Sequence, residues 1–411
     1  MPIGFYISVP FCKTKCSYCN FASDVFSRVR MQGYVDRVTA QIHDSGSLAE
    51  WFAVQVPRDV DTIYLGGGTP SILHPTQLEA IFRAIYRQFK VGDDAEITVE
   101  CAPGTISEEM LRTLLRCGVN RVSLGVQSFV DNEARSVGRL HTRAVVEADI
   151  TRLRNAGIGN INVDLIAGLP HQTATSWDES LEASITQEIP HVSVYMLEVD
   201  EDSRLGSELL AGGTRYHAHF VPDDDATADF YSFACEKLES EGIQQYEISN
   251  FARPGSESRH NLKYWTRQPY LGFGVDAHSM LPSRDPSLDA VRLATAENLD
   301  DYMVRTTKDG FSCTAVDRQQ AWEETFFLGL RLNRGVNLAE VERRFGREKA
   351  GQAQNIVTEL LSNELVELRG DHLCLTSAGR LLSNEVFKAF LRDKTGVDDV
   401  ITIVPVSSTI Q

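Results

Sequence analysis

The chain has 411 residues, which exceeds what one hydrophobic core usually supports, so we expect a large domain accompanied by a smaller one. Its net charge of -17, from 40 Lys and Arg against 57 Asp and Glu, would repel phosphate backbones and argues against nucleic acid as a partner. The first residues lack the basic and apolar regions of an export signal and no run of 18 apolar residues occurs, so we expect a cytoplasmic protein without a membrane span, with peripheral membrane contact left open.

Short β-branched runs alternate with amphipathic stretches in the first half of the chain. The predicted strands are residues 3–9, 61–65, 96–100, 121–125, 160–166 and 191–197. The predicted helices between them are residues 33–52, 75–89, 107–117, 144–155 and 176–188. This alternation gives a parallel sheet with right-handed crossovers. Six units rather than eight predict an α/β fold with an open, partial (β/α)6 barrel.

Three cysteines, Cys12, Cys16 and Cys19, follow the first predicted strand with CxxxCxxC spacing. Three thiolates can hold three irons of a four-iron cluster and leave the fourth iron open to a small chelating molecule. Zinc is the weaker alternative, because a structural zinc site needs a fourth ligand and the next cysteine is Cys101. The five remaining cysteines are scattered, and we expect them to be small apolar residues rather than disulfide partners.

The residues after the other predicted strands are also candidates, because ligands of parallel β/α proteins lie beyond the carboxyl ends of the strands. The second strand is followed by Gly66-Gly67-Gly68-Thr69-Pro70, where glycine lets a backbone approach a ligand closely. Glu100 ends the third strand and needs a partner such as a ribose or an ammonium group. A tight turn and an ordinary ion pair are the structural alternatives for these two features.

Taken together, these motifs resemble the radical S-adenosylmethionine (radical SAM) enzymes, and the wider pattern resembles their HemN/HemW group. The further matching stretches are Arg121-Val122-Ser123-Leu124-Gly125-Val126-Gln127-Ser128, Asp164-Leu165-Ile166-Ala167-Gly168-Leu169-Pro170 and Tyr246-Glu247-Ile248-Ser249-Asn250-Phe251. The resemblance implies that the three cysteines ligate a [4Fe-4S] cluster and that S-adenosylmethionine binds at its open iron. It implies that this cofactor is surrounded by Tyr6, Tyr18, Gly68, Thr69 and Glu100, with Gln127, Arg139 and Asp164 further along the cavity.

Two features favour the haem-binding chaperones of this group over its coproporphyrinogen III oxidases. The oxidases carry a long extension before the cluster and an additional cysteine just after it, where this chain has Phe21. The stretch His260-Asn261-Leu262-Lys263-Tyr264-Trp265 resembles the chaperones' haem-binding motif, which implies His260 as a haem ligand. The alternative is an ordinary histidine at a helix start, with the aromatic residues in the core.

The resemblance therefore implies a haem chaperone with haem-acceptor proteins and an electron donor as partners, and it leaves homodimerisation open. An oxidase, a radical methyltransferase of tetrapyrroles and a purely structural iron-sulfur or zinc scaffold are the rival functions. Two departures from the group concern the site: Ala102 replaces a commoner asparagine, and Asp276 stands where glycine is usual. The added carboxylate of Asp276 would repel porphyrin propionates or bind a cation.

The pattern changes from about residue 317. Residues 321–324, 326–332, 338–345 and 353–361 are predicted helices, residues 366–369 and 372–376 a hairpin, and residues 378–391 a last helix. Helices followed by a small hairpin resemble a winged helix. This C-terminal region has equal numbers of acidic and basic residues, which argues against DNA binding. We expect a radical SAM barrel at 1–230, a haem-motif segment at 231–312, a mostly helical winged-helix-like domain at 313–395 and a tail at 396–411.

Overall fold

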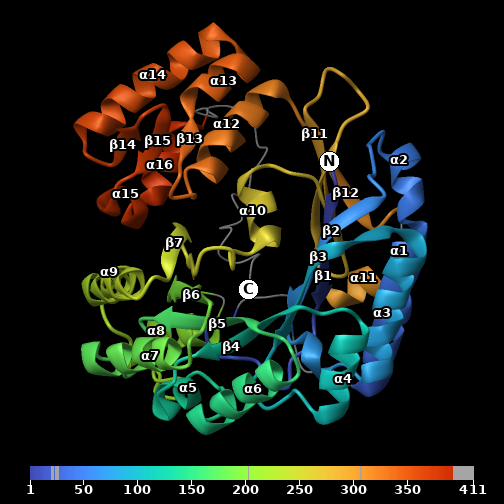
Figure 1. Cartoon of the computed structure of the whole chain (residues 1–411), viewed down its shortest axis with the longest axis vertical. Helices are drawn as coiled ribbons and strands as arrows, with labels where there is room; N and C mark the ends of the chain where they lie inside the picture. Colours follow the sequence, from blue (N-terminus) through green and yellow to red (C-terminus); the bar gives the residue numbers. More distant parts are fainter. Residues whose placement is uncertain (20–22, 24–26, 202, 306–307, 392–411) are drawn as a thin grey trace.

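Six parallel strands form the centre of the molecule in the computed structural model, which describes residues 1–19, 23, 27–201, 203–305 and 308–391 (Figure 1). In spatial order they are β1 (Ile3–Val9), β2 (Asp59–Gly67), β3 (Lys90–Cys101), β4 (Arg121–Gln127), β5 (Asn160–Ala167) and β6 (His191–Met196). All five neighbouring pairs are parallel. The predicted partial (β/α)6 barrel is confirmed.

Helices cover the outer face of these strands. They are α1 (Arg28–Asp44), α2 (Leu48–Trp51), α3 (Pro75–Gln88), α4 (Glu108–Arg116), α5 (Asp131–Ser136), α6 (Arg143–Asn155) and α7 (Ala174–Thr186). The predicted helix at 33–52 is interrupted, since α1 ends at Asp44 and a short 3-10 turn, η1 (Ser45–Ser47), precedes α2. α3 begins as its sequence suggests, with Pro75 at its first position and a capping box between His74 and Gln77.

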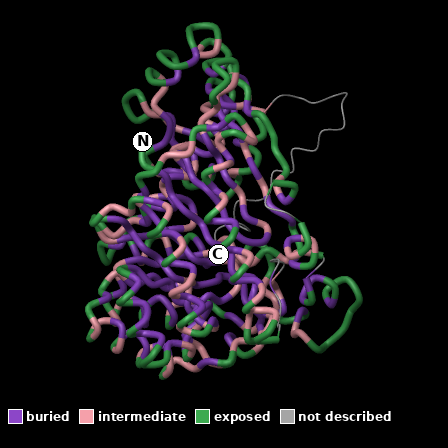
Figure 2. Tube along the Cα trace, turned by 90° about the vertical axis from the view of Figure 1, so that its right-hand side faces the viewer, coloured by how far each residue is buried: buried purple, intermediate pink, exposed green. Residues whose placement is uncertain are grey.

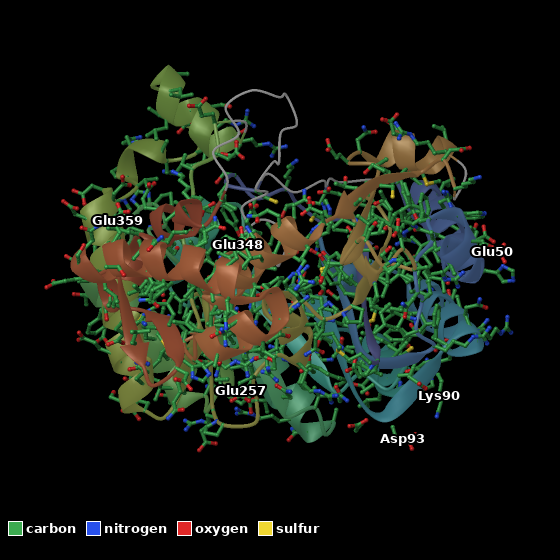
Figure 3. All side chains as sticks on the ribbon, turned by 90° about the horizontal axis from the view of Figure 1, so that it is seen from above. Glu50, Lys90, Asp93, Glu257, Glu348 and Glu359 are labelled. Atoms are coloured by element: carbon green, nitrogen blue, oxygen red, sulfur yellow. The ribbon has the colours of Figure 1, made fainter. Side chains whose placement is uncertain are left out.

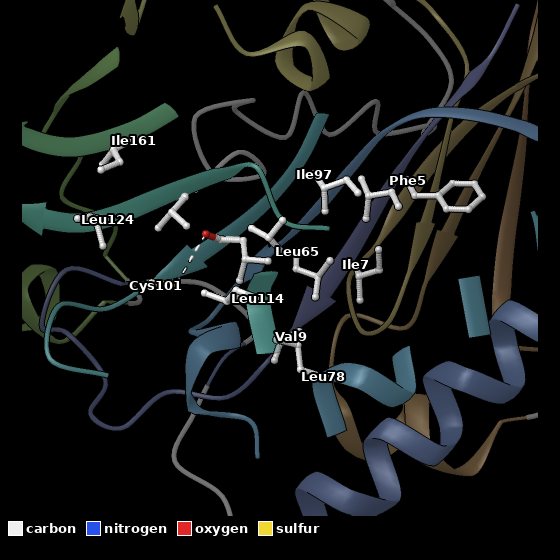
Figure 4. Close-up of a cluster of buried hydrophobic side chains, with 14 of the residues drawn as sticks. Phe5, Ile7, Val9, Leu65, Leu78, Ile97, Cys101, Leu114, Leu124 and Ile161 are labelled. Atoms are coloured by element: carbon white, nitrogen blue, oxygen red, sulfur yellow. Dashed lines mark hydrogen bonds between the residues drawn. The ribbon is translucent and has the colours of Figure 1, made fainter. Parts of the chain in front are cut away.

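The two faces of the strands differ in chemistry. Outward residues such as Phe5, Ile7 and Val9 are fully buried against the helices and form the main hydrophobic core (Figures 2 and 4). Inward residues on the same strands are largely polar, and they pair across the sheet in layers. One layer joins Gly4, Thr62 and Glu96, and a second joins Tyr6, Tyr64 and Thr98. Because side chains alternate along a strand, the barrel interior is a polar space enclosed by an apolar shell.

The sheet extends beyond the six predicted strands on both sides. β7 (Gln244–Glu247) and β8 (Asn250–Ala252) join β6, while β9 (Tyr270–Phe273), β10 (His278–Pro282), β11 (Ala290–Thr295) and β12 (Phe311–Val316) continue from β1. The connecting helices are α8 (Arg204–Ala211), α9 (Asp224–Ser240), α10 (Arg259–Trp265) and α11 (Leu299–Val304), with the 3-10 turn η3 (Ala218–Phe220) between α8 and α9. One 12-stranded sheet thus contains strands from both sides of the boundary proposed at residue 231.

The C-terminal part has its own sheet and its own hydrophobic cluster. Its elements are α12 (Arg318–Gly329), β13 (Val336–Asn337), α13 (Leu338–Phe345), α14 (Arg347–Ser362), β14 (Val366–Arg369), β15 (His372–Leu375), α15 (Ser377–Leu381) and α16 (Ser383–Ala389). The predicted hairpin is present. The two helices expected at 321–332 are one helix, and the last predicted helix is divided in two. The expected tail at 396–411 lies outside the described residues.

Buried ion pairs connect the C-terminal part to the barrel. The carboxylate of Glu324 on α12 accepts hydrogen bonds from Arg267 (2.8 Å) and from Arg292 on β11 (2.8 and 3.0 Å). Arg331 lies 3.7 Å from the fully buried Glu247 of β7. The side chain of Glu348 on α14 is exposed, and that of Glu257 is partly exposed (Figure 3). Among the described helices, none combines the length and the apolar character that a membrane crossing requires.

Candidate functional site

A cavity of about 660 Å³, measured with its open mouth, lies at the carboxyl ends of the parallel strands. Its walls contain most of the predicted site residues: Cys12, Cys16, Tyr18, Cys19, Gly68, Thr69, Glu100, Gln127, Arg139 and Asp164. These residues come from the loops after β1 and β2, from β3, β4 and β5, and from the segment between α5 and α6. The fold therefore brings together residues that are more than 150 positions apart in the chain.

The cysteine loop is held by backbone contacts on both sides. The backbone N–H groups of Gly68 and Thr69 donate to the carbonyls of Val9 (2.8 Å) and Phe11 (2.7 Å), which begin the loop. A Cβ atom on Gly68 would lie 2.7 Å from each of these two carbonyl oxygens. Only glycine fits at this position, which gives a physical reason for the glycine run after β2.

The three thiols differ in exposure, with Cys16 buried and Cys12 and Cys19 half-buried. Burial raises the pKa of the Cys12 thiol, and hydrogen bonds from Ser23 and Thr69 act in the opposite direction. No three His, Cys, Asp or Glu side chains of the described residues converge on a point where they could share one metal ion.

A buried cation lies behind the cysteine loop. The guanidinium of Arg139 donates to the Tyr18 hydroxyl at 3.1 Å. Burial acts to lower the pKa of Arg139, but the nearby Cys16 and Tyr18 raise it overall. Burial raises the pKa of Tyr18. A fixed positive charge beside thiols favours their deprotonated, metal-binding form.

Two carboxylates form the opposite wall. Glu100 accepts a hydrogen bond from the Tyr64 hydroxyl at 2.9 Å, and burial together with the neighbouring Asp164 raises the pKa of Glu100 to about 8. Asp164 accepts from Ser123 (3.1 Å) and Asn162 (2.7 Å), and burial raises its pKa as well. Two carboxyl groups that are difficult to ionise together would be relieved by a cationic ligand between them.

Gln127 presents an unused acceptor to the same cavity. Its side-chain carbonyl oxygen is buried and has no hydrogen-bond partner within the described part of the chain. Its backbone is in the left-handed region, with φ of 65°, which is uncommon for a residue other than glycine. A strained residue with an unsatisfied buried acceptor is typical of a ligand site.

Tyr6 does not line the cavity. It lies one layer below, where its ring stacks on Tyr64 (6.1 Å between centroids, 28° between planes). Its hydroxyl is 3.5 Å from the position that a Cβ on Gly67 would take. The role predicted for Tyr6 as a direct neighbour of the cofactor stays a prediction.

His260 lies at the other end of the barrel. It is 1% exposed on α10, next to Gly4 and Thr62 in the layer nearest the amino ends of the strands. Its Nδ1 is 2.8 Å from the Thr62 hydroxyl and its Nε2 is 2.9 Å from the Tyr264 hydroxyl. Burial and the charge of Lys263 lower its pKa to about 3. Both ring nitrogens thus have partners, and haem ligation by His260 stays a prediction.

Several residues of the cavity were not predicted from the sequence. Thr14, Lys15 and Ser23 lie inside or beside the CxxxCxxC stretch, and Gly125 precedes the strained Gln127. Their closeness to predicted residues was the available signal. Asp276 has φ of 51°, which explains why glycine is usual there, and its carboxylate faces His278 at 3.6 Å.

Comparisons with known proteins agree with this geometry. Residues 6–183 match the radical SAM superfamily, and residues 316–382 match the HemN C-terminal domain. The heme chaperone HemW of Bacillus subtilis is 33% identical over 94% of this chain and 98% of its own length. The chain belongs to the HemW family. The heme chaperone HemW of Lactococcus lactis is similarly related, at 32% identity over 95% of this chain and 98% of its own.

The fold of this HemW-family chain also matches a solved structure, that of coproporphyrinogen III oxidase (HemN) from Escherichia coli. The TM-score is 0.80, the sequence identity 23%, and the match covers 95% of this chain and 90% of the other. Membership of the radical SAM superfamily implies a [4Fe-4S] cluster and S-adenosylmethionine as cofactors. The grouped cysteines, the tight glycine turn and the unsatisfied Gln127 oxygen fit these two groups.

Proposed function

We propose that this protein is a haem chaperone that holds a [4Fe-4S] cluster and S-adenosylmethionine in the barrel cavity and delivers haem to acceptor proteins. The observation that carries the proposal is the nearly full-length match to curated relatives named heme chaperone HemW. An electron donor to the cluster, a cytoplasmic location and a domain division near residues 231 and 313 belong to the same proposal.

The cavity residues have separate tasks in this proposal. Cys12, Cys16 and Cys19 hold the cluster, which supplies one-electron chemistry when it is bound. Glu100 and Asp164 provide negative charge for the cationic ammonium and sulfonium groups of the cofactor, and both carboxylates can accept from hydroxyl groups.

The remaining residues orient the cofactor. The side-chain oxygen of Gln127 accepts a hydrogen bond from it, and the glycine turn at Gly68 admits the backbone close to it. Arg139 balances the charge of the thiolates from behind the loop, through its position beside Tyr18 and Cys16.

Anaerobic reconstitution of one preparation tests the proposal. We expect iron and sulfide to bind at the stoichiometry of one four-iron cluster, added S-adenosylmethionine to perturb its electron paramagnetic resonance spectrum, and haemin to bind and move to an apo-acceptor protein. Cys16→Ser should lose the cluster. A chain that takes up no haemin would refute the chaperone function, and an unperturbed spectrum would favour a structural scaffold.

Coproporphyrinogen III oxidase is the second candidate, favoured by the likeness in fold to HemN. Anaerobic incubation with coproporphyrinogen III, S-adenosylmethionine and a reductant separates the two functions. The chaperone should release no carbon dioxide and form no protoporphyrinogen. Steady formation of both products would establish the oxidase instead.

The proposed role of His260 has its own test. His260→Ala should weaken haemin binding while leaving the iron content unchanged. Tyr264→Phe removes the hydroxyl that occupies Nε2 of His260 but keeps the ring, so it should strengthen haemin binding if His260 is the ligand. Equal haemin affinity in His260→Ala and the native chain would refute ligation by His260.

A further inference from the structure

Arg121 is a buried guanidinium inside the barrel, below the cavity described above. It begins β4, and the next residue, Val122, lies in the hydrophobic core outside the strands, so Arg121 points into the barrel. Its side chain is one of the largest that the fold encloses, at 1% exposed. Its Nε–H has no hydrogen-bond partner within the described part of the chain. Burial of a charged group without such partners is costly, so its position needs a physical explanation.

The neighbours of Arg121 in the sheet also have unsatisfied polar atoms. Arg121 pairs with Thr98 of β3 on one side and with Asn160 of β5 on the other. Among the residues that the structure describes, neither the Thr98 hydroxyl nor the side-chain carbonyl oxygen of Asn160 has a hydrogen-bond partner. The flanking residues Ile97 and Ile161 lie in the hydrophobic core (Figure 4), so the polar side chains face inward. Three adjacent strands thus present unsatisfied polar atoms in one layer of the barrel.

The carboxylates of the barrel lie in other layers. On the central strands, the layer of Arg121 is completed by Tyr6 and Tyr64. Glu100 lies one inward position further along β3, where it accepts from the Tyr64 hydroxyl. Asp164 lies further along β5 and accepts from two neutral side chains. The hydrogen bonds of these two carboxylates are therefore made to groups other than Arg121.

The charge of Arg121 acts on groups at both ends of the barrel. Burial raises the pKa of Glu100 and of Asp164 in the cavity wall, and the charge of Arg121 opposes this rise. Burial, Lys263 and Arg121 together lower the pKa of His260 on α10. A guanidinium does not lose its proton inside a protein. Arg121 therefore keeps a positive charge between the cavity and α10, and an anion bound to it would be close to both.

We propose that Arg121 and Thr98 form a carboxylate-binding site in the barrel interior, bordered by Asn160. The planar guanidinium donates two parallel N–H bonds to the carboxylate oxygens, and the Thr98 hydroxyl donates a third bond. The amide of Asn160 has donors as well as an acceptor, so it can also contact the bound group. One carboxylate balances the single charge of Arg121, whereas a phosphate would bring about two negative charges to one cation.

The carboxylate can come from a small free acid or from an acidic side group of a larger guest such as a tetrapyrrole. Both sources present the same two oxygens and the same charge to Arg121. The inference goes beyond the proposed function, because the site would exist for a free acid even in a chain that is not a haem chaperone.

Isothermal titration calorimetry of the reconstituted full chain with sodium propionate, at fixed ionic strength, tests the free acid. We expect saturable binding of one propionate per chain. Arg121→Gln and Thr98→Val should each weaken it at least about tenfold, because each removes a hydrogen bond to a charged group. Thr98→Val keeps the side-chain shape and the charge of Arg121, so it tests the site even if Arg121→Gln does not fold. Arg112→Gln is the control, because Arg112 is 61% exposed on α4, and it should leave binding unchanged.

Haemin and its dimethyl ester, which lacks free carboxylates, test the larger guest. If the site receives a carboxylate of the tetrapyrrole, the native chain should bind haemin at least about tenfold more tightly than the ester, and Thr98→Val and Arg121→Gln should reduce this preference. If the site receives a small acid, propionate should bind as described and the preference should not depend on Arg121.

The outcomes separate this inference from the proposed function. Propionate binding and haemin preference that are both unchanged in the two variants, or absent from the native chain, would overturn the site and assign its polar atoms to ordered water only. The chaperone function would stand in that case as long as haemin binds and moves to an acceptor. Saturable, Arg121-dependent propionate binding in a chain that takes up no haemin would establish the site and refute the chaperone function.

Discussion

Replacement of Glu100 by glutamine tests the electrostatics of the cavity directly. Burial and the nearby Asp164 raise the pKa of Glu100 from 4.5 to about 8. The folded chain therefore binds a proton at Glu100 more tightly than the unfolded chain does. The associated stability is fully present below pH 4.5 and is lost as the pH rises through 8. Glutamine keeps the acceptor for the Tyr64 hydroxyl and cannot ionise.

The size of the effect follows from this pKa shift. At pH 7 Glu100 is ionised in almost every unfolded chain but is mostly protonated in the folded chain. This difference lowers the unfolding free energy at pH 7 by about 3 kcal/mol relative to its value at low pH. Glu100→Gln should remove this loss in the cluster-free protein. The variant should match the native chain at pH 4.5 and become more stable than it as the pH rises, by up to about 3 kcal/mol at pH 7.

Urea-induced unfolding of both chains at pH 4.5, 6, 7 and 8 measures the difference. Glu359→Gln is a suitable control, because Glu359 is an exposed glutamate on α14 (Figure 3), and it should leave the unfolding free energy unchanged at every pH. A Glu100→Gln variant whose stability parallels that of the native chain from pH 4.5 to 8 would refute the reasoning, since it would show that burial does not hinder ionisation of this carboxyl.

Two further predictions concern the glycine turn and the domain contact. Gly68→Ala should displace the cysteine loop and lower the iron bound per chain after reconstitution, because the added Cβ would lie 2.7 Å from two carbonyl oxygens. Gly351→Ala on α14 is the control and should leave the iron content unchanged, because its Cβ would have no heavy atom within 4 Å. Equal iron in both variants would contradict this prediction. Glu324→Ala leaves the 4% exposed Arg267 without its closest carboxylate and should lower the unfolding free energy by about 3–5 kcal/mol in urea. The exposed pair of Glu385 and Lys388 is its control, and Glu385→Ala should cost less than about 1 kcal/mol; similar losses in both variants would contradict the argument.

Sequence periodicity located the six central strands because each is a short β-branched run bounded by turn residues, and β1 agrees residue for residue with its prediction. The edge strands β7 to β12 were not predicted. Several are only three to six residues long, as β8 (Asn250–Ala252) shows, and their pairing with distant strands depends on tertiary contacts rather than on local pattern. The ion pairs could not be predicted either, since Glu324 and Arg292, which pair in the structure, are 32 positions apart in the sequence.

The sequence was a better guide to which residues line the cavity than to their pKa values and backbone conformations. CxxxCxxC and the glycine run are local signals, and the rule that sites follow strand ends was enough to add Glu100, whereas Asp164 was predicted from the family resemblance. The left-handed backbone of Gln127 and the raised pKa of Glu100 could not be derived in this way. They arise from the enclosure of these side chains by strands that are remote in sequence.

The segment around His260 shows why a motif and its surroundings must be considered together. The carboxylate of Glu96 accepts from the backbone N–H groups of Arg259 (3.0 Å) and His260 (3.0 Å), at the start of α10, and the ring of His260 stacks on Tyr64 (5.3 Å between centroids). These contacts close the amino end of the barrel with the residues that the motif supplies. Ligation of haem by His260 would require this end to open, because both ring nitrogens of His260 already have hydrogen-bond partners there. Haem binding through His260 should therefore be slow and should lower the protection of α10 from hydrogen exchange, and unchanged protection of α10 on haemin binding would contradict ligation by His260.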